Sequence, residues 1–154
     1  MKLRNTGTFM IAAVVCICAL IAAAQTKPDF TGSWKMNREK SKFERGGPAA
    51  LLIKIDHKEP AFVEDWKMTT PNGERSFQAK YTTDGKETEQ EVIGRTAKTS
   101  AKWEGDALLI EFKTEGGFFK RKITLSADGK TITKVVTQSG DNGQTEDTVV
   151  FEKQ

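Results

Sequence analysis

Few side chains in this sequence are suited to catalysis. His57 is the single histidine, and the two cysteines, Cys16 and Cys18, lie in an N-terminal apolar run. A histidine beside a carboxylate such as Glu64 can act as a general base, but no nucleophile is predicted beside this pair. One histidine without a cysteine in the rest of the chain also argues against a zinc site. The sequence therefore predicts no enzyme, no metal site and no cofactor, and we interpret His57 as a hydrogen-bonded residue at a strand end.

Arg121 and Lys134 are the side chains best suited to hold an acidic ligand. They are predicted to share one face of two neighbouring strands. Burying two unpaired cations is costly, so the pair needs an anion, a wet interior or a carboxylate partner such as Asp147. The functional interpretation is a clamp for an acidic group. The structural alternatives are that Arg121, Lys134 or Lys153 rests on the ring of Trp34, or that both cations face outward.

The elements that position these residues are short segments in which apolar and polar residues alternate from residue 30 onward, with turn pairs about every ten residues. This pattern predicts an all-β fold, an antiparallel up-and-down meander of about ten strands. A long meander does best to close into a barrel, because closure removes both unpaired edges. One stretch departs from the pattern. Residues 37–43 are predicted to form a turn or two of helix after the first strand, with Asn37 as its cap.

The turn pairs also predict the register. Asp84-Gly85 predicts a two-residue hairpin that places Tyr81 opposite Thr88. Asn142-Gly143 places Val136 opposite Val149. The other turns pair Val92 with Arg95, Trp103 with Leu108, Phe112 with Phe119, and Leu125 with Ile132. Every predicted hairpin keeps its apolar face on the same side of the sheet, and a slip of one residue would lose this agreement.

The predicted lumen face is rich in aromatic residues, but its middle is small and polar. The predicted strands 88–92 and 95–103 turn Thr88, Gln90, Ala97 and Ala101 inward. Such groups leave volume unfilled and supply hydrogen-bond partners, which is typical of a small-molecule pocket. The residues that we expect to bind a ligand are Trp66, Tyr81, Gln90, Thr99, Trp103, Phe112, Arg121 and Lys134.

The first 24 residues have the pattern of a removable export signal. Lys2 and Arg4 precede an apolar run over residues 9–24, and Ala22-Ala23-Ala24 offers small residues for cleavage before Gln25. The run is short for a bilayer span of roughly 20 residues. We therefore expect a signal peptide over residues 1–24 and one barrel domain over residues 25–154. This domain would have no membrane span, and its destination would be the periplasm or the extracellular space.

The charge balance argues against nucleic acid as a partner. The chain has 24 Lys and Arg residues, 21 Asp and Glu residues and a formal charge of +3. Removal of Lys2 and Arg4 with the export signal leaves a charge near +1, too small for a basic field. We expect a monomer whose partner is a small hydrophobic or acidic ligand.

Two motifs resemble those of a known family. Asp29-Phe30-Thr31-Gly32-Ser33-Trp34-Lys35 resembles the Phe-x-Gly-x-Trp opening of the calycins, which include lipocalins and intracellular fatty-acid-binding proteins. Trp103-Glu104-Gly105-Asp106-Ala107-Leu108-Leu109-Ile110 is similar to the tryptophan hairpin of the second group. The whole layout is similar to the lipocalin-like proteins that many bacteria export. The resemblance implies a barrel in which Gly32 lets the first strand bend and Trp34 fills one end.

The chain also departs from the fatty-acid-binding pattern. Those proteins hold the ligand carboxylate with an Arg-x-Tyr pair on the last strand, where this chain reads Asp147-Thr148-Val149-Val150-Phe151. Their helical lid is longer than residues 37–50 allow. Two hypotheses remain: an exported lipocalin-like protein that binds a small, mostly apolar ligand in the lumen, and an envelope interaction or scaffold protein with a filled barrel. The empty volume inside the barrel separates them.

Overall fold

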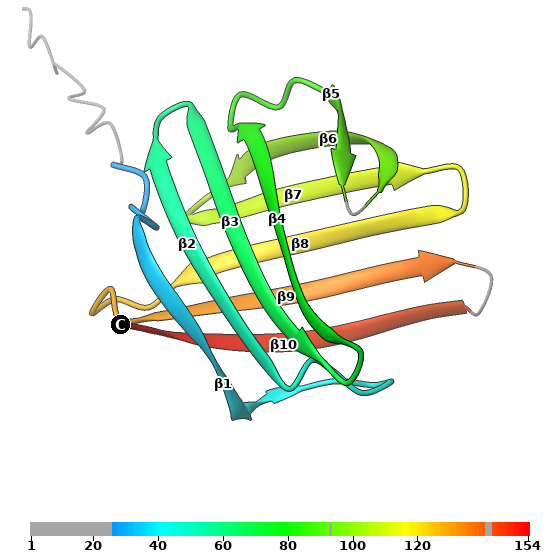
Figure 1. The fold of residues 1–154 in the computed structure, drawn as a ribbon. Coiled ribbons are helices and arrows are strands. Elements are labelled where there is room, and N and C mark those ends of the chain that lie inside the picture. Colours follow the sequence, from blue (N-terminus) through cyan, green and yellow to red (C-terminus); the bar gives the residue numbers. More distant parts are fainter. Residues whose placement is uncertain (1–25, 93, 141–142) are drawn as a thin grey trace, which may run out of the picture.

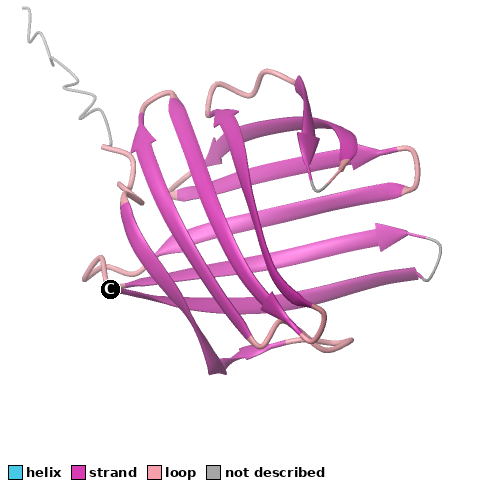
Figure 2. Cartoon of the chain, viewed as in Figure 1, coloured by secondary structure: helices cyan, strands magenta, loops and turns pink. Residues whose placement is uncertain are grey.

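The computed structural model describes residues 26–92, 94–140 and 143–154, so the predicted export signal lies outside the described residues. Figure 2 shows strands and loops in this part of the chain, and no helix. No helix long and apolar enough to cross a bilayer occurs in these three ranges. The strands are β1 (Gly32–Lys42), β2 (Ala50–Lys58), β3 (Ala61–Thr70), β4 (Gly73–Thr82), β5 (Thr88–Val92), β6 (Arg95–Glu104), β7 (Ala107–Thr114), β8 (Gly117–Leu125), β9 (Thr131–Gly140) and β10 (Gly143–Lys153).

All ten strands form one antiparallel sheet in the order β4-β3-β2-β1-β10-β9-β8-β7-β6-β5. The first and last strands pair, with Trp34 opposite Lys153. The sheet curls until β1–β4 lie across the strands β6–β10 (Figure 1), and Asp84 forms an isolated bridge to Lys102 near the two free edges. The structure confirms the predicted all-β meander and the pairing of its ends, in a nearly closed barrel.

Two ends of the barrel can be distinguished. The closed end contains Phe30 and Trp34, which are 0% and 1% exposed. Trp34 Nε1 donates a hydrogen bond to the carbonyl of Phe30, and Lys153 Nζ lies 5.4 Å from the centroid of the Trp34 ring. Lys153 is therefore the cation that rests on Trp34. We call the opposite end, where β3 joins β4 and β7 joins β8, the mouth.

Gly32 permits the close contact between β1 and β10 at the closed end. Its φ is +144°, in a region that L-residues with side chains rarely adopt. A Cβ at this position would lie 3.0 Å from Lys153 Cε. The bend predicted for Gly32 therefore also makes room for the side chain that covers Trp34.

The predicted helix over residues 37–43 is wrong, because residues 37–42 continue β1. The strand is irregular there: Asn37 pairs with Val150 and Lys42 pairs with Thr148, so extra residues bulge from β1. The Asn37 side chain accepts a hydrogen bond from the Lys40 amide at 3.0 Å, as a helix cap would. Asn37 therefore forms the hydrogen bond that a helix cap would form, but this bond stabilises a bulge in β1.

The predicted register holds for four hairpins and fails for two. Val92–Arg95, Trp103–Leu108, Phe112–Phe119 and Leu125–Ile132 pair as expected. In the last hairpin Val149 pairs with Lys134, not with Val136. The pairing is shifted by two residues, so each side chain stays on the predicted face of the sheet. The predicted pairing of Tyr81 with Thr88 is also wrong, because β4 and β5 are the two edges of the sheet.

Candidate functional site in the barrel lumen

A buried carboxylate lies at the centre of the lumen. Glu64 on β3 is 0% exposed. Its Oε1 lies 2.5 Å from Nζ of Lys134 on β9, and its Oε2 lies 2.9 Å from Nη1 of Arg121 on β8. Trp66 Nε1 donates to the same Oε2 at 3.2 Å. Strands on opposite sides of the barrel therefore meet at one side chain. We call Glu64, Arg121 and Lys134 the lumen charge cluster.

Aromatic rings surround the guanidinium of Arg121. Its Cζ lies 4.8 Å from the ring centroid of Phe112 and 5.2 Å from that of Trp66. Its Nη2 donates to the hydroxyl of Tyr81 at 2.7 Å. Arg121 Nε is buried and has no hydrogen-bond partner in the part of the chain that the structure describes. The arrangement thus leaves one strong donor of Arg121 unused.

Lys134 is held among rings as well. Its Nζ lies 4.4 Å from the Trp66 centroid and 5.4 Å from the Phe151 centroid. The side chain is 1% exposed. Contacts of an ammonium group with ring faces are favourable and gain strength when water is excluded. Trp66 therefore contacts all three members of the lumen charge cluster.

The cluster is not electrically balanced, because two cations share one carboxylate. Burial raises the pKa of Glu64, but the charges of Arg121 and Lys134 outweigh burial and hold this pKa below its usual value. Burial lowers the pKa of Lys134 to about 8, and the Arg121 charge acts in the same direction against the opposing effect of Glu64. At neutral pH the cluster carries a net positive charge in a poorly hydrated interior, which favours an anion.

The side chains become more accessible from the cluster toward the mouth. Lys134 is 1% exposed, Arg121 is 7% exposed, and Phe119, two residues closer to the mouth on the same face as Arg121, is 45% exposed. Trp66, Met68 and Val136 pack against the core but are only partly buried. Partly buried apolar side chains thus lie between the lumen charge cluster and the mouth, and we call the level of the cluster the floor of the lumen.

Five of the eight predicted ligand-binding residues meet at this floor. Contacts with Arg121 or Lys134 bring together Trp66, Tyr81, Phe112, Arg121 and Lys134. Both cations face the lumen, so the alternative in which they face outward is wrong, as is the one in which either rests on Trp34. The other three residues lie in two different places.

Gln90 and Thr99 lie where the barrel closes between its two edge strands. Gln90 Nε2 donates to the Lys80 carbonyl at 2.9 Å and to Thr99 Oγ1 at 2.7 Å. Gln90 Oε1 accepts from the Lys80 amide at 3.2 Å. One side-chain amide therefore replaces a missing pair of main-chain hydrogen bonds between β4 and β5. We call this contact the Gln90 bridge.

The open volume predicted beside Ala97 and Ala101 is not present. These residues are 3% and 0% exposed, and Thr99 is 1% exposed. The connection after β4 packs against this wall, since the Gly85 amide donates to the Ala101 carbonyl at 2.8 Å. Small side chains here allow a close approach of the chain, so they do not leave a pocket.

Trp103 belongs to the closed end. Its ring stacks on Phe30 with centroids 5.9 Å apart and an interplanar angle of 13°. Its Nε1 donates to Glu59 Oε1 at 2.8 Å, and His57 Nε2 lies 2.9 Å from the same oxygen. Glu64 lies diagonal to His57 across the β2–β3 hairpin, as the sequence predicts, since His57 pairs with Phe62 and Ile55 pairs with Glu64. The carboxylate that the His57 ring contacts is nevertheless Glu59. The interpretation of His57 as a hydrogen-bonded strand-end residue is confirmed.

Glu64 is the site residue that the sequence reasoning missed. The partner suggested for the cations, Asp147, instead accepts a hydrogen bond from the Glu44 amide at 2.9 Å. A signal for Glu64 was present, because it alternates with Phe62, Trp66 and Met68 on one strand face. A single carboxylate on an apolar face predicts a buried partner for an inward cation.

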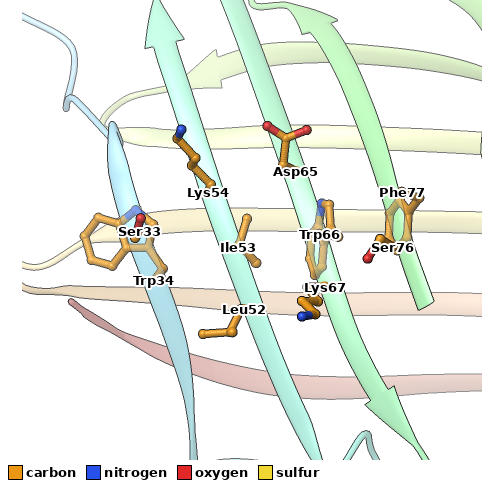
Figure 3. Close-up of a pocket in the computed structure, with 10 residues that line it drawn as sticks. All are labelled: Ser33, Trp34, Leu52, Ile53, Lys54, Asp65, Trp66, Lys67, Ser76 and Phe77. Carbon is orange, nitrogen blue, oxygen red and sulfur yellow. The ribbon is translucent and has the colours of Figure 1, made fainter. Parts of the chain in front are cut away.

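Two hollows in the surface of the described residues lie outside the lumen. One, of about 510 Å³, lies on the outer face of β1–β4. Figure 3 shows its wall, where the exposed side chains of Leu52, Lys54, Asp65 and Lys67 alternate with inward neighbours. The same view shows the parallel rings of Trp66 and Phe77, whose centroids are 5.5 Å apart. The other, of about 700 Å³, is lined by charged residues such as Lys98 and Lys113.

Comparison with known proteins identifies the fold. No protein-family model and no curated protein matches the sequence. The zebrafish ileal bile acid-binding protein, in complex with cholic acid, superposes with a TM-score of 0.59 at 20% identity, over 81% of this chain and 98% of that one. The chain has the calycin fold.

Two further solved calycin structures agree with this assignment. The REP1-NXSQ fatty acid transporter has a TM-score of 0.64 at 13% identity, with 81% of this chain and 96% of that chain covered. The fatty-acid-binding protein 1 of Echinococcus granulosus has a TM-score of 0.60 at 13% identity, with coverage of 80% and 96%. The likeness extends over nearly the whole of each of these proteins.

Proposed function

We propose that this protein is an exported calycin that binds a small, mostly apolar molecule in the mouth half of its barrel, with an acidic end of the ligand against Arg121. The observation that carries the proposal is the lumen charge cluster, in which two buried cations share one carboxylate. A ligand anion at Arg121 would neutralise the remaining charge and accept from the unused Nε. Solved proteins with this fold include a bile-acid-binding protein and a fatty acid transporter, which supports the ligand class.

Apolar side chains between the floor and the mouth would supply the apolar part of the site. Phe119 lies toward the mouth, Phe112 and Trp66 lie beside Arg121, and Phe77 stacks on Trp66. Tyr81 accepts a hydrogen bond from Arg121, and burial raises the pKa of its hydroxyl, which therefore keeps its proton. This hydroxyl would donate its proton to the bound anion. The export signal predicted over residues 1–24 supports a destination outside the cytoplasm.

The test compares two fluorescent probes of similar size. 8-Anilinonaphthalene-1-sulfonate is anionic, and N-phenyl-1-naphthylamine is neutral. Both are titrated into the exported protein, whose intact mass reports whether residues 1–24 are removed. The wild type is compared with Arg121→Met and with Lys153→Met, a matched variant that loses the cation over Trp34 at the closed end. Arg121→Met leaves Glu64 paired with Lys134, so no buried charge is orphaned and folding is retained.

We expect Arg121→Met to weaken binding of the anionic probe by about 10-fold to 100-fold, the effect of a lost charge-assisted hydrogen bond. Binding of the neutral probe should change less than about twofold, and Lys153→Met should alter neither. Equal losses of affinity for both probes would show that Arg121 does not distinguish an anionic ligand from a neutral one. Binding of neither probe by the wild type would favour the alternative of a scaffold protein with a filled barrel.

A further inference from the structure

The amine of Lys134 is unusually placed for a lysine. Its side chain is 1% exposed and lies between the rings of Trp66 and Phe151. Its oxygen contact is with Glu64 Oε1 at 2.5 Å. Lysine is among the residues least often fully buried. Lys134 is therefore a primary amine that is buried among aromatic rings at the floor of the lumen, adjacent to a fixed carboxylate.

The charges around Lys134 weaken its hold on a proton. Glu64 on β3 favours the ammonium form, but Arg121 on β8 shares that carboxylate and repels a second cation. Tyr81 on β4 stays neutral, and β10 contributes the apolar Phe151. With its pKa lowered to about 8, roughly one Lys134 amine in ten is neutral at pH 7, against fewer than about one in a thousand for an ordinary lysine. A neutral amine is the form that attacks a carbonyl.

We propose that Lys134 captures an apolar aldehyde as a Schiff base. The proposal rests on the proposed function, because the aldehyde must enter the lumen from the mouth as the ligand would. The neutral Nζ adds to the carbonyl carbon to give a carbinolamine. This adduct loses water, which carries away the carbonyl oxygen with the two amine hydrogens, and a C=N bond replaces the C=O bond. Uptake of one proton gives an iminium ion, and no oxidant or reductant takes part.

The site suits the product as well as the amine. The iminium nitrogen carries the same positive charge as the ammonium that it replaces, so Glu64 keeps its ion pair. The ring faces of Trp66 and Phe151 remain available to a delocalised cation. Exclusion of water from the floor slows the return hydrolysis. Capture therefore leaves no buried charge unpaired. An unpaired buried charge would be the main energetic cost of a covalent change in such a cluster.

The experiment uses 4-(dimethylamino)cinnamaldehyde, an apolar aldehyde whose absorbance shifts to longer wavelength when it forms an iminium ion. The exported protein is incubated with the aldehyde at pH 7, with and without cyanoborohydride, and analysed by absorbance, intact mass and peptide mapping. Lys134→Met, which leaves Glu64 paired with Arg121, is the test variant. Lys153→Met is the matched control, since Lys153 also lies over a tryptophan ring. Glycolaldehyde serves as a polar aldehyde.

We expect one adduct per chain, located on Lys134, with a red-shifted absorbance. The adduct and the shift should be absent from Lys134→Met and retained by Lys153→Met, and glycolaldehyde should show no preference for Lys134. Adducts spread over many lysines, or an equal yield in Lys134→Met, would overturn covalent capture. Binding of the anionic naphthalene probe without any Lys134 adduct would overturn capture alone. Failure of both probe binding and adduct formation would overturn the proposed function too.

Discussion

Glu64 determines the electrostatics of the lumen. It is fully buried, and its two oxygens face Lys134 and Arg121 separately. Loss of Glu64 would leave two cations in an apolar interior, whereas loss of either cation leaves a neutral pair. Breaking a buried ion pair on one side typically costs about 3–5 kcal/mol because a charge is left uncompensated. The unequal roles of the three residues explain why variants of Arg121 and Lys134 are the informative ones.

The buried amine of Lys134 predicts that the protein becomes more stable in mild alkali. The pKa of Lys134 is lowered to about 8 from a model-compound value of 10.5, so between these values the unfolded chain binds more protons than the folded one. The free energy of unfolding therefore rises with pH in this window. From pH 8 to 9.5 we expect a gain of about 1 to 2 kcal/mol, measured by urea unfolding.

Lys134→Met is the control for this pH series, and its stability should be flat over the same range. The series stops at pH 9.5 because the raised pKa of Tyr81 acts in the opposite direction once unfolded tyrosine ionises near pH 10. A wild-type curve as flat as that of the variant would mean that Lys134 keeps an ordinary pKa.

The Gln90 side chain supplies main-chain groups at a sheet edge with the hydrogen bonds that a neighbouring strand would otherwise provide. β4 and β5 are the two edges of the sheet, and a side-chain amide binds both the N–H and the C=O of Lys80. Thr99 holds the same amide at 2.7 Å, which fixes its orientation. An unpaired edge exposes main-chain groups to other chains. The Gln90 bridge therefore satisfies one edge residue and ties the two edges together.

Gln90→Ala should loosen the barrel at this point alone. We expect the Lys80 amide to exchange its hydrogen at least about tenfold faster, because its acceptor is lost. The amides of β7 and β8 should be unaffected. Gln78→Ala is the matched control, since Gln78 lies on the same strand but bonds to Asp65 on the paired side. Equal acceleration in both variants would show that the Gln90 bridge contributes nothing specific to closure.

The sequence predicted elements well where pattern and turn chemistry agree, and poorly where tertiary packing decides. Alternation identified the inward faces, including those of Arg121 and Lys134. Alternation could not show that β4 and β5 would not pair and would become the two edges of the sheet. Asp84-Gly85 is a turn signal whether or not the strands on its two sides pair. In β1, Asn37 gave a real capping signal, but pairing with β10 kept the segment extended. The alternation of Glu64 with three apolar residues indicates an inward carboxylate, but only the closure of the barrel brings it to Arg121 and Lys134 on β8 and β9.

The whole barrel is held by one pairing between distant parts of the chain. Trp34 lies opposite Lys153, whereas every other pair of neighbouring strands is consecutive in the sequence. The C-terminus lies beside the start of β1, because the Gln154 amide donates to the Ser33 carbonyl at 2.9 Å. Closing a loop of this length costs entropy before any contact stabilises it. We therefore expect the β1–β10 contact to limit the rate of folding.

The contact of Gln154 with the start of β1 and the two unpaired edges together define a circular permutant with a simpler strand order. If the chain is cut between Lys86 and Glu87 and Gln154 is joined to Lys27 by a flexible linker of about six residues, the strands run from β5 to β4 in sheet order. Every ladder then becomes a hairpin between consecutive strands. Stopped-flow refolding should be several-fold faster than that of the natural chain at matched stability, and slower refolding would place the limiting step elsewhere. In the natural chain, the first and last strands therefore lie in the middle of the sheet, whereas in the permutant they would lie at its two edges.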